Sequence, residues 1–167
     1  MKQKKSALTD YAEKRDFSKT PEPRASTSDQ KNASIFVIHE HHASHKHFDL
    51  RLAIDGVLVS WAVPKGISND PTQKHLAIRT EDHPMSYAHF EGIIPKGNYG
   101  AGTVMVWDYG TYTNVKMHDG ELVDMPTCLE NGRIEIALHG KKLHGNYALI
   151  KTTSYGKDDW LVFKMND

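Results

Sequence analysis

The sequence predicts a mainly all-β fold, in which short antiparallel strands form a barrel or a sandwich behind an irregular N-terminal arm. Three observations indicate it. Short apolar runs recur from Ile35 onward, and turn dipeptides such as Asp55-Gly56 separate them. Helical periodicity is hard to find, and the chain contains no internal repeat. A chain of 167 residues is expected to form one domain that buries about 70% of its unfolded surface.

The first segment, residues 1–31, differs in composition from the rest. It holds eight Lys and Arg against five Asp and Glu, with Ser, Thr and Pro throughout, as in DFSKTPEPRASTSDQ. Such a polar, aperiodic segment is typical of a loose tail or an extended arm. We therefore expect an arm over residues 1–31 and a β domain over residues 32–167. Composition alone also predicts that the arm adds little to a core, so that its deletion costs little stability.

Three strands are predicted at the start of the β domain. Ile35–His41 is followed by a turn at His42–His45, and Lys46–Ile54 is followed by the Asp55-Gly56 turn. Val57–Val63 forms the third strand and ends at Pro64.

Later strands are shorter and are separated by turn dipeptides that include His139-Gly140 and Tyr155-Gly156. A short helix is predicted over Glu121–Leu129, interrupted by Pro126. Trp61, Trp107 and Trp160 lie in apolar runs and are expected in the core. The predicted later strands are Leu76–Arg79, Gly102–Asp108, Arg133–Leu138, Asn146–Thr152 and Trp160–Met165.

Charge and hydropathy exclude several classes of protein. The net charge is zero with neutral histidines, so extensive polyanion binding is not indicated. No run approaches ~18 apolar residues, and no apolar segment follows the basic Met1–Lys5, so neither a membrane span nor a secretory signal is expected. Cys128 is the single cysteine, which suits a reducing compartment. A cytoplasmic protein without a membrane partner is therefore predicted.

The segment HEHHASHKHFDLRL, residues 39–52, holds five of the eleven histidines within nine positions. Side chains alternate along a strand, so His47, Asp49 and Arg51 share one face of the second predicted strand. His41 can lie beside His47 and Asp49 if the first two strands pair across their short turn. Two imidazoles and a carboxylate favour Mn²⁺, Fe²⁺, Zn²⁺ or Co²⁺ over Ca²⁺ or Mg²⁺.

The alternative is a solvated hairpin with incidental histidines, or a metal-binding artefact like that of a histidine tag. Arg51 argues against it, because a guanidinium one step beyond a metal-binding carboxylate is well placed to bind an oxyanion through two hydrogen bonds.

Gly97, Gly100 and Gly102 superficially suggest a phosphate loop, but a strand follows them where such loops require a helix. We expect these glycines to serve a hairpin or a bulge. His83, before Pro84, is by itself more typical of a loop.

Three long motifs carry a resemblance to a known family. They are HHASHKHFDLRLAIDGVLVSWAVPKG, EDHPMSYAHFEGIIPKGNYGAGTVMVWDYG and, in the arm, YAEKRDFSKTPEP. Together they resemble the 3′-phosphoesterase domain of bacterial DNA ligase D over Tyr11 to Phe163. The resemblance implies a compact β-barrel that uses Mn²⁺, with Co²⁺ or Zn²⁺ as alternatives. It also implies processing of 3′ ends during end-joining repair, in which a 3′-terminal ribonucleoside is removed and the remaining 3′-phosphate is hydrolysed to a 3′-OH.

The resemblance also implies site residues by motif position. The implied metal ligands are the three residues that the strand pattern predicts: His41, His47 and Asp49. The implied shell around the phosphate comes from the arm, the second strand and a later loop: Arg15, Asp16, Glu22, Arg51, His83 and Tyr87. The sequence departs from the family at two positions expected to contact substrate, since His39 stands where relatives often carry Gln and His75 where they often carry Arg.

Partners follow from the same resemblance. The expected substrate is a DNA primer-template that ends in a 3′-ribonucleotide or a 3′-phosphate. Because no ligase or polymerase segment is attached, an ATP-dependent DNA ligase and a polymerase are expected on separate chains, and the protein is expected to be a monomer. Lys2, Lys4 and Lys5 are expected to add at most a salt-sensitive affinity for DNA.

Two other function classes fit parts of the pattern. His47-x-Asp49 with a further histidine also matches the facial triad of non-haem iron oxygenases. Oxygen uptake with an α-keto acid and Fe²⁺ discriminates that class. A non-catalytic module that binds nucleic-acid ends would bind a primer-template but leave a 3′-phosphate intact, and it has no evident need for a metal triad.

Overall fold

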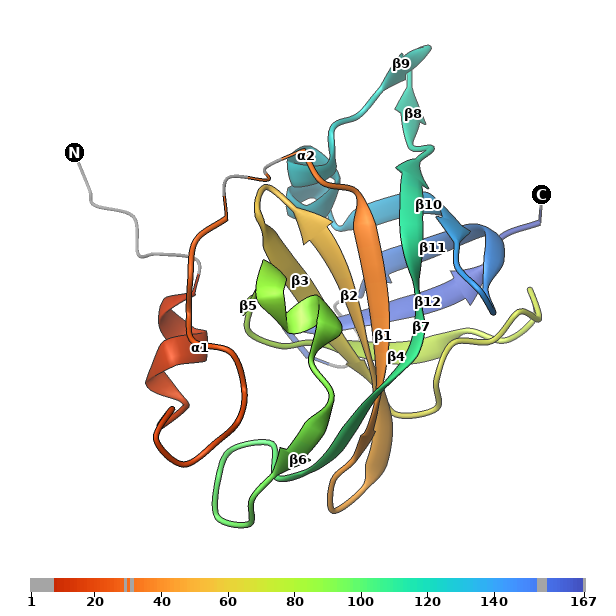
Figure 1. The fold of residues 1–167 in the computed structure, drawn as a ribbon. Coiled ribbons are helices and arrows are strands. Elements are labelled where there is room, and N and C mark those ends of the chain that lie inside the picture. Colours follow the sequence, from red (N-terminus) through yellow and green to blue (C-terminus); the bar gives the residue numbers. More distant parts are fainter. Residues whose placement is uncertain (1–7, 29, 31, 153–155, 167) are drawn as a thin grey trace.

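Eight antiparallel strands close into a barrel in the computed structural model, which describes residues 8–28, 30, 32–152 and 156–166. Closure results because β1 pairs with both β2 and β7 (Figure 1). The all-β barrel is therefore confirmed. Around the ring, the strands are β1 (Ile35–His42), β2 (Lys46–Ile54), β3 (Val57–Val63), β4 (His75–Arg79), β12 (Asp159–Lys164), β11 (His144–Lys151), β10 (Arg133–His139) and β7 (Gly102–Asn114).

The predicted bounds of β2 and β3 are confirmed, and β1 extends one residue beyond its prediction. Asp55 and Gly56 both have positive φ, 52° and 85°, as a two-residue hairpin turn requires. In the β1–β2 pair His41 lies opposite His47. Predictions on Lys2, Lys4 and Lys5 and on the Tyr155-Gly156 turn fall wholly or partly outside the described residues.

Strand β7 is longer than predicted. It pairs with β1 as far as Thr111 and then with β10, so it continues across a corner of the barrel. Gly110 lies at this corner, where an added Cβ would come 2.1 Å from the carbonyl oxygen of His139. The predicted strand ends at Asp108, before Gly110, but in the structure this glycine is the point of closest approach between two strands.

The helix predicted over Glu121–Leu129 is corrected to α2 (Met125–Asn131). Pro126 lies in its first turn, where no backbone donor is needed, and Asp124 caps the helix by accepting from the backbone N–H of Thr127 at 2.9 Å. The start of the predicted helix is instead strand β9 (Glu121–Leu122). Elements without a sequence prediction are α1 (Thr9–Glu13), β5 (His83–Pro84), the 3₁₀-helix η1 (Met85–His89), β6 (Gly92–Ile94) and β8 (Met117–His118).

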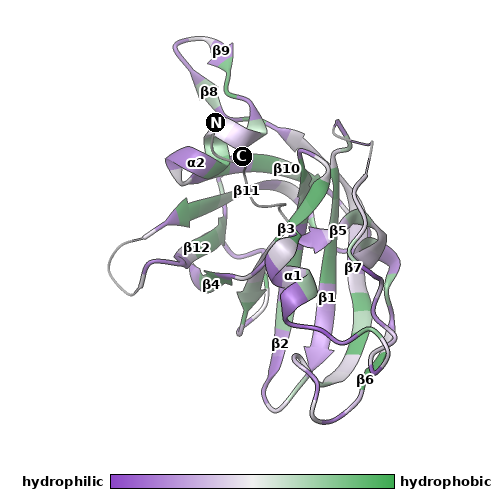
Figure 2. Ribbon diagram, turned by 90° about the vertical axis from the view of Figure 1, so that its left-hand side faces the viewer, coloured by the Kyte–Doolittle hydropathy of each residue, from purple (hydrophilic) through white to green (hydrophobic). Residues whose placement is uncertain are grey.

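The barrel interior is the larger of two hydrophobic clusters. Trp61 and Trp160 pack there with ring centroids 5.4 Å apart, as predicted. Trp107 is only half-buried and packs edge-on against Phe48. Along β1, hydrophobic residues give way to hydrophilic ones toward its C-terminal end (Figure 2). Among the described residues, no helix is long and apolar enough to cross a membrane.

The second cluster lies outside the barrel and joins the arm to it. Tyr11 from α1 is fully buried and packs against Tyr87 of η1, with Val37 and Leu58 from the barrel wall in the same cluster. The hydroxyl of Tyr11 donates to the carbonyl oxygen of Pro23, and this hydrogen bond ties α1 to the later part of the arm. The arm therefore supplies core residues, contrary to the expectation from its composition.

Candidate active site

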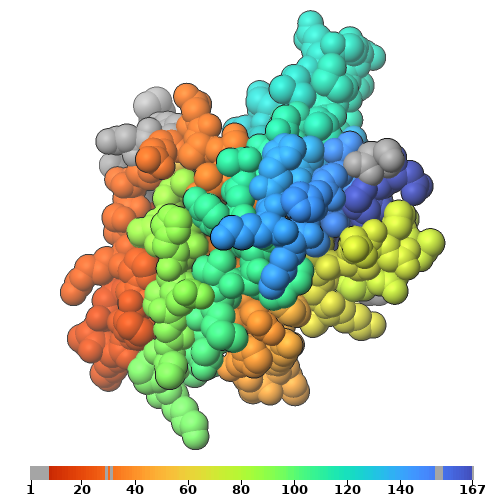
Figure 3. Space-filling model, turned by 45° about the vertical axis from the view of Figure 1, so that its right-hand side comes forward, coloured from red at the N-terminus to blue at the C-terminus, as the bar shows by residue number. Residues whose placement is uncertain are grey.

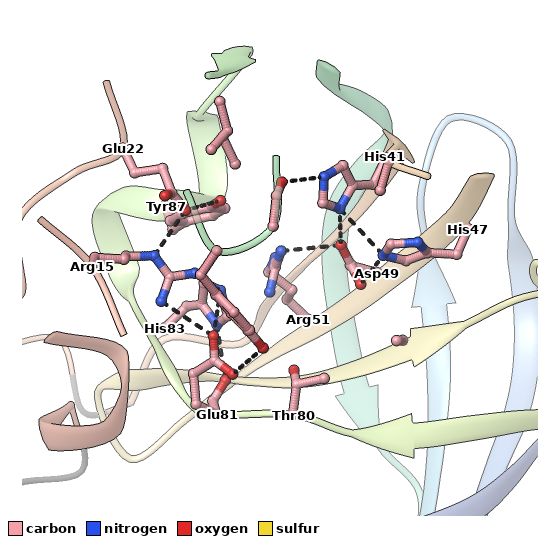
Figure 4. A pocket seen from close by; sticks show the side chains of 15 residues that line it. Arg15, Glu22, His41, His47, Asp49, Arg51, Thr80, Glu81, His83 and Tyr87 are labelled. Carbon is pink, nitrogen blue, oxygen red and sulfur yellow. Dashed lines mark hydrogen bonds and ion pairs between the residues drawn. The ribbon is translucent and has the colours of Figure 1, made fainter. Parts of the chain in front are cut away.

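A cavity of about 250 Å³ lies on the outer face of the barrel, where β1 and β2 meet the arm and η1 (Figure 4). Strand alternation directs the apolar side chains of β2 into the barrel and its polar side chains into this cavity, as predicted. The polar side chains that line it come from six segments: Arg15, Glu22, His41, His47, Asp49, Arg51, Thr80, Glu81, His83, Tyr87 and Tyr99.

Three of these side chains converge from the β1–β2 hairpin. His41 Nδ1 lies 3.2 Å from His47 Nε2 and 3.6 Å from Asp49 Oδ2, and His47 Nε2 lies 3.2 Å from Asp49 Oδ1. The pairing of His41 with His47 across the hairpin produces this geometry. The convergence predicted from the strand pattern is confirmed.

Backbone carbonyls fix which ring nitrogen each histidine presents. His41 Nε2 lies 2.7 Å from the carbonyl oxygen of Gly100, and His47 Nδ1 lies 3.1 Å from that of His45. Each of these nitrogens must donate, so the lone pairs of His41 Nδ1 and His47 Nε2 face each other and Asp49. Burial alone would raise the pKa of Asp49, but the polar surroundings of its carboxylate, which include the charge of Arg51, outweigh burial and hold that pKa well below its usual range.

This donor set fits a divalent transition metal ion. Tetrahedral or octahedral coordination with bonds of roughly 2.1 Å places neighbouring donor atoms roughly 3.0–3.4 Å apart. The observed separations of 3.2, 3.2 and 3.6 Å are close to that range. Two imidazole nitrogens and a carboxylate oxygen are also the donors that such ions prefer. His41, His47 and Asp49 are thus a group that could hold a metal ion.

Arg51 lies next to this group and is held by contacts with four residues. It donates from Nη1 to Ser60 Oγ at 3.0 Å and from Nη2 to Asp49 Oδ2 at 3.4 Å, and its guanidinium lies 4.7 Å from the Tyr87 ring centroid. Its Nε donates to His39 Nδ1 at 3.0 Å. A side chain so constrained presents its charge in one fixed direction.

His39 lies behind Arg51 and is fully buried, so it does not reach the cavity. Its Nε2 donates to the carbonyl oxygen of Phe90 at 3.0 Å, which leaves Nδ1 free to accept from Arg51. Burial, and then the charge of Arg51, lower the pKa of His39 to about 3, so the ring is neutral. The structure thus places His39 against Arg51 and not in the cavity wall.

The arm contributes a second guanidinium, that of Arg15, and the carboxylate of Glu22 holds it in place. Arg15 donates from Nε to Glu22 Oε2 at 2.9 Å, and the hydroxyl of Tyr87 donates to the same oxygen at 2.7 Å. Glu22 Oε1 accepts from Thr20 Oγ1 at 2.9 Å. The Arg15 guanidinium also lies 4.0 Å from the Tyr11 ring centroid. The buried Glu22 therefore orients both Arg15 and Tyr87 in the cavity wall.

His83 lies between the two arginines. Its Nδ1 is 2.9 Å from the carbonyl oxygen of Glu81 and donates there, so Nε2 carries the lone pair, 3.4 Å from Arg15 Nη2. Burial and the charges of Arg51 and Arg15 hold the pKa of His83 well below its usual value. The ring is therefore neutral, with a proton-accepting atom in the cavity.

Two residues named by the family motif lie elsewhere. Asp16 has a 55% exposed side chain and accepts from the backbone N–H and the hydroxyl of Ser18, so the structure does not bring it into the cavity. His75 Nδ1 is 2.6 Å from the carbonyl oxygen of Gly66, and its side chain lines a separate hollow with Lys65. Neither residue lines the cavity, and the roles that the resemblance implies for them stay predictions.

Glu81 and Tyr99 line the cavity although sequence reasoning did not select them. Glu81 Oε1 accepts from Arg15 Nη1 at 3.2 Å, while Oε2 accepts from Lys14 Nζ at 3.2 Å and from Tyr99 at 3.3 Å. Glu81 precedes His83 by two residues, so alternation along an extended segment could have indicated that both face the same way. No comparable pattern marks Tyr99.

The charges in the cavity favour a bound cation. Two guanidiniums (Arg15 and Arg51) and three carboxylates (Glu22, Asp49 and Glu81) give a net charge of −1 with neutral histidines. A divalent ion changes this to +1, which attracts an anion such as phosphate. Figure 4 shows the candidate metal-binding group, His41, His47 and Asp49, on one side of Arg51, and Arg15 and His83 on the other.

Comparison with known proteins gives the family. Residues 39–151 match the family model described as the DNA Ligase D 3′-phosphoesterase domain. A multifunctional non-homologous end joining DNA repair protein LigD from Mycobacterium tuberculosis (strain ATCC 25618 / H37Rv) is 48% identical over 96% of this chain and 20% of its own length. The corresponding protein from Pseudomonas aeruginosa (strain PAO1) is 47% identical over 96% of this chain and 19% of its own length.

The chain therefore spans about a fifth of the length of these relatives. The family match includes β1 from His39 onward and all of β2, which together carry His41, His47 and Asp49, and it includes the segment that carries Glu81, His83 and Tyr87. The arm precedes it, but the match to the relatives covers 96% of the chain. The chain belongs to the DNA ligase D 3′-phosphoesterase domain family.

Proposed function

We propose that the protein is a metal-dependent phosphoesterase that processes the 3′ ends of DNA strands for repair by end joining. It removes a 3′-terminal ribonucleoside from a primer strand and then hydrolyses the remaining 3′-phosphate to a 3′-OH. The observation that carries the proposal is one small cavity in which a metal-binding group adjoins two buried arginines. Family membership supports the same reaction class.

His41, His47 and Asp49 hold the ion, for which Mn²⁺ is the proposed occupant and Co²⁺ or Zn²⁺ the alternatives. When bound, such an ion supplies Lewis-acid polarisation of a phosphate oxygen. Asp49 is suited to binding the ion because its carboxylate stays ionised. The two histidines are suited because hydrogen bonds to Gly100 and His45 hold their lone pairs toward it.

Arg51 and Arg15 bind the non-bridging oxygens of the phosphate from two directions. Their fixed orientations stabilise negative charge that develops in the transition state without further rearrangement of the site. Glu22 keeps Arg15 and the Tyr87 hydroxyl in place. Lysine could match the charge of either arginine but not its two parallel donors.

His83 can accept a proton at Nε2 from the attacking water and pass it to the leaving oxygen as the old P–O bond breaks, because its other nitrogen is committed to the carbonyl oxygen of Glu81. A neutral imidazole beside two arginines binds that proton weakly until an anionic phosphate enters the cavity and stabilises it. Carboxylate oxygens in the wall, such as those of Glu81, are acceptors suited to the 2′-OH of a terminal ribonucleotide, which is recognised there.

The metal-binding group alone also fits an iron oxygenase, and an end-binding module needs no such group. The side chains of Arg15 and Arg51, each only 4% exposed beside the group, and the family match favour phosphoester chemistry over both. The relatives are named as multifunctional end-joining proteins. We propose that this chain acts on primer-template ends together with ATP-dependent DNA ligase and polymerase activities, and that it does so as a monomer.

The experiment is a gel assay with a 5′-labelled primer-template that ends in one ribonucleotide. With Mn²⁺, the labelled primer should be converted first to a shorter strand with a 3′-phosphate and then to a strand with a 3′-OH. Excess chelator should stop both steps. An unchanged primer under all metal conditions, with oxygen uptake in the presence of an α-keto acid and Fe²⁺, would overturn the proposal.

A further inference from the structure

The active-site cavity is too small for a strand of nucleic acid. Its 250 Å³ lies below the ~300–1,000 Å³ of pockets that enclose drug-sized ligands, so it holds the reacting phosphate and its immediate neighbours only. The rest of a strand must leave through an adjoining depression. Two depressions share residues with the cavity.

The first, the turn groove, has a volume of about 540 Å³ and shares Ala43 and Gly100 with the cavity. It is lined by His42, Ala43, Ser44, Lys96, Gly100, Ala101 and Gly102. The second, the acidic cleft, has a volume of about 340 Å³ and shares Thr80 and Glu81 with the cavity. It is lined by Asp10, Lys14, Arg79, Thr80, Glu81, Asp82 and Asp158.

The two depressions adjoin opposite sides of the active site. The turn groove lies between the β1–β2 turn and the β6–β7 loop, which project side by side from one end of the barrel (Figures 1 and 3). It reaches the metal-binding group, since Gly100 accepts a hydrogen bond from His41. The acidic cleft reaches the side of the cavity where Glu81 binds Arg15.

Charge distinguishes the two depressions. Two cationic and four acidic residues line the acidic cleft, so its charge is −2. The turn groove has one lysine and no carboxylate, so its charge is +1 with His42 neutral. Each phosphodiester carries one negative charge. A strand of phosphodiesters is therefore repelled by the acidic cleft and attracted by the turn groove.

The residues of the turn groove suit a backbone that approaches closely. Glycines and alanines form much of its lining, and Gly102 lies so near the turn that an added Cβ would come 2.2 Å from the carbonyl oxygen of His42. Lys96 is exposed and forms no ion pair with any residue in the described ranges. By contrast, Lys46 on the neighbouring strand is paired with Glu40 at 2.8 Å. Lys96 is thus a cation that a ligand can use.

We propose that the turn groove binds the primer strand on the 5′ side of the reacting phosphate, and that Lys96 contacts a backbone phosphate there. This inference rests on the proposed function. It fixes the direction of the substrate, because the strand then leaves past the metal-binding group. The terminal nucleoside, which has no phosphate beyond the reacting one, lies on the side of Arg15 and Glu81.

Position-specific crosslinking tests this direction. In a Lys96→Cys variant, the new thiol is open to a photocrosslinking label, whereas the native Cys128 is only 1% exposed. With Mn²⁺ and a primer-template ending in the product 3′-OH, crosslinks should form with the last few nucleotides of the primer strand. Lys141→Cys, at an exposed position outside both depressions and the cavity, is the matched control. Crosslinks mainly to the template strand, or equal yields from the two variants, overturn the inference.

Salt dependence of binding gives a second readout. Loss of one phosphate contact in Lys96→Ala should reduce the slope of log affinity against log salt by about 0.7–0.9, and Lys141→Ala should leave it unchanged. Equal slopes for wild type and Lys96→Ala contradict the assignment. Turnover of a primer-template of the same sequence that ends in one 3′-ribonucleotide is measured in parallel with the wild-type protein. If the wild type leaves the 3′ end intact, the proposed function itself has failed; if it processes the end and the Lys96 variants behave as wild type, only the strand path has failed.

Discussion

The two halves of the active site are built in different ways. The metal half, His41, His47 and Asp49, lies within nine residues of one hairpin, and the pairing of two adjacent strands is enough to form it. The anion half is assembled from the arm, from β2 and from the segment after β4. Its contacts join residues more than sixty positions apart, such as Arg15 and His83. Deletions and substitutions in the local metal half should therefore have different effects from those in the non-local anion half.

Deletion of residues 1–24 should have the largest effect. It removes Arg15 and Glu22 from the anion half and exposes the surface that Tyr11 covers. Removal of a large buried aromatic costs about 3–5 kcal/mol, and for a domain of this size that is a fall of roughly 6–20 °C in melting temperature. End processing should be lost, but titration calorimetry should still detect Mn²⁺ binding by the hairpin.

A variant that lacks only residues 1–7 keeps every described arm contact and is the control for this deletion. It should melt and turn over like the full chain. An unchanged melting temperature after the longer deletion would show that the arm is the loose tail that its composition suggests. Loss of Mn²⁺ binding after the longer deletion would show that the two halves are not independent.

Asp49→Ala should show the opposite pattern to the long deletion, because it damages the metal half and leaves the arm in place. It removes the one anionic ligand from the metal half, so Mn²⁺ binding should be lost and activity should fall by roughly 10³-fold or more. The arm and its contacts with Glu22 and Tyr87 remain, so the melting temperature should change little compared with that of the long deletion. Retained Mn²⁺ binding in the variant would remove Asp49 from the ligand set.

The sequence predicted the metal half and the strands beneath it because both depend on local rules. Alternation along β1 and β2, with a short turn between them, fixes which side chains face outward and which histidine lies opposite which. The anion half follows no such rule. Arg15, Glu22, His83 and Tyr87 were implied by family motifs, and nothing in their spacing indicates that Glu22 binds both Arg15 and Tyr87.

Tertiary packing decided the remaining features. Tyr99 lies in the cavity because the β6–β7 loop folds back toward the arm, which no local pattern encodes. Asp16 stands next to Arg15 in the chain but points to solvent. Strand β7 runs through Gly110, where close approach to His139 requires a glycine. In each case, contacts with distant residues override what neighbouring residues suggest.

Arg51→Lys tests the point where the two halves meet. The variant keeps the charge but loses donors to His39 and Ser60 and the two-pronged geometry. Loss of one charge-assisted hydrogen bond costs about 1.5–3 kcal/mol, or roughly ten- to a hundred-fold in kcat/KM if it acts in the transition state. Mn²⁺ affinity should change only a few-fold. Wild-type kcat/KM in this variant would make Arg51 peripheral.

His39→Gln should have the smallest effect and gives the sharpest test of a positioning role. His39 accepts from Arg51 Nε through one ring nitrogen and donates to Phe90 through the other. A glutamine amide has one acceptor and donors of its own, so it can make both contacts. We expect kcat/KM within about three-fold of wild type, which is a smaller change than the loss of one hydrogen bond to a charged group would cause.

His39→Leu fills similar space but leaves Arg51 Nε unpaired, so kcat/KM should fall roughly ten-fold or more with Mn²⁺ affinity unchanged. Equal, large losses in both variants would mean that the imidazole itself takes part in the reaction, and equal, negligible losses would mean that Arg51 does not depend on His39 for its orientation.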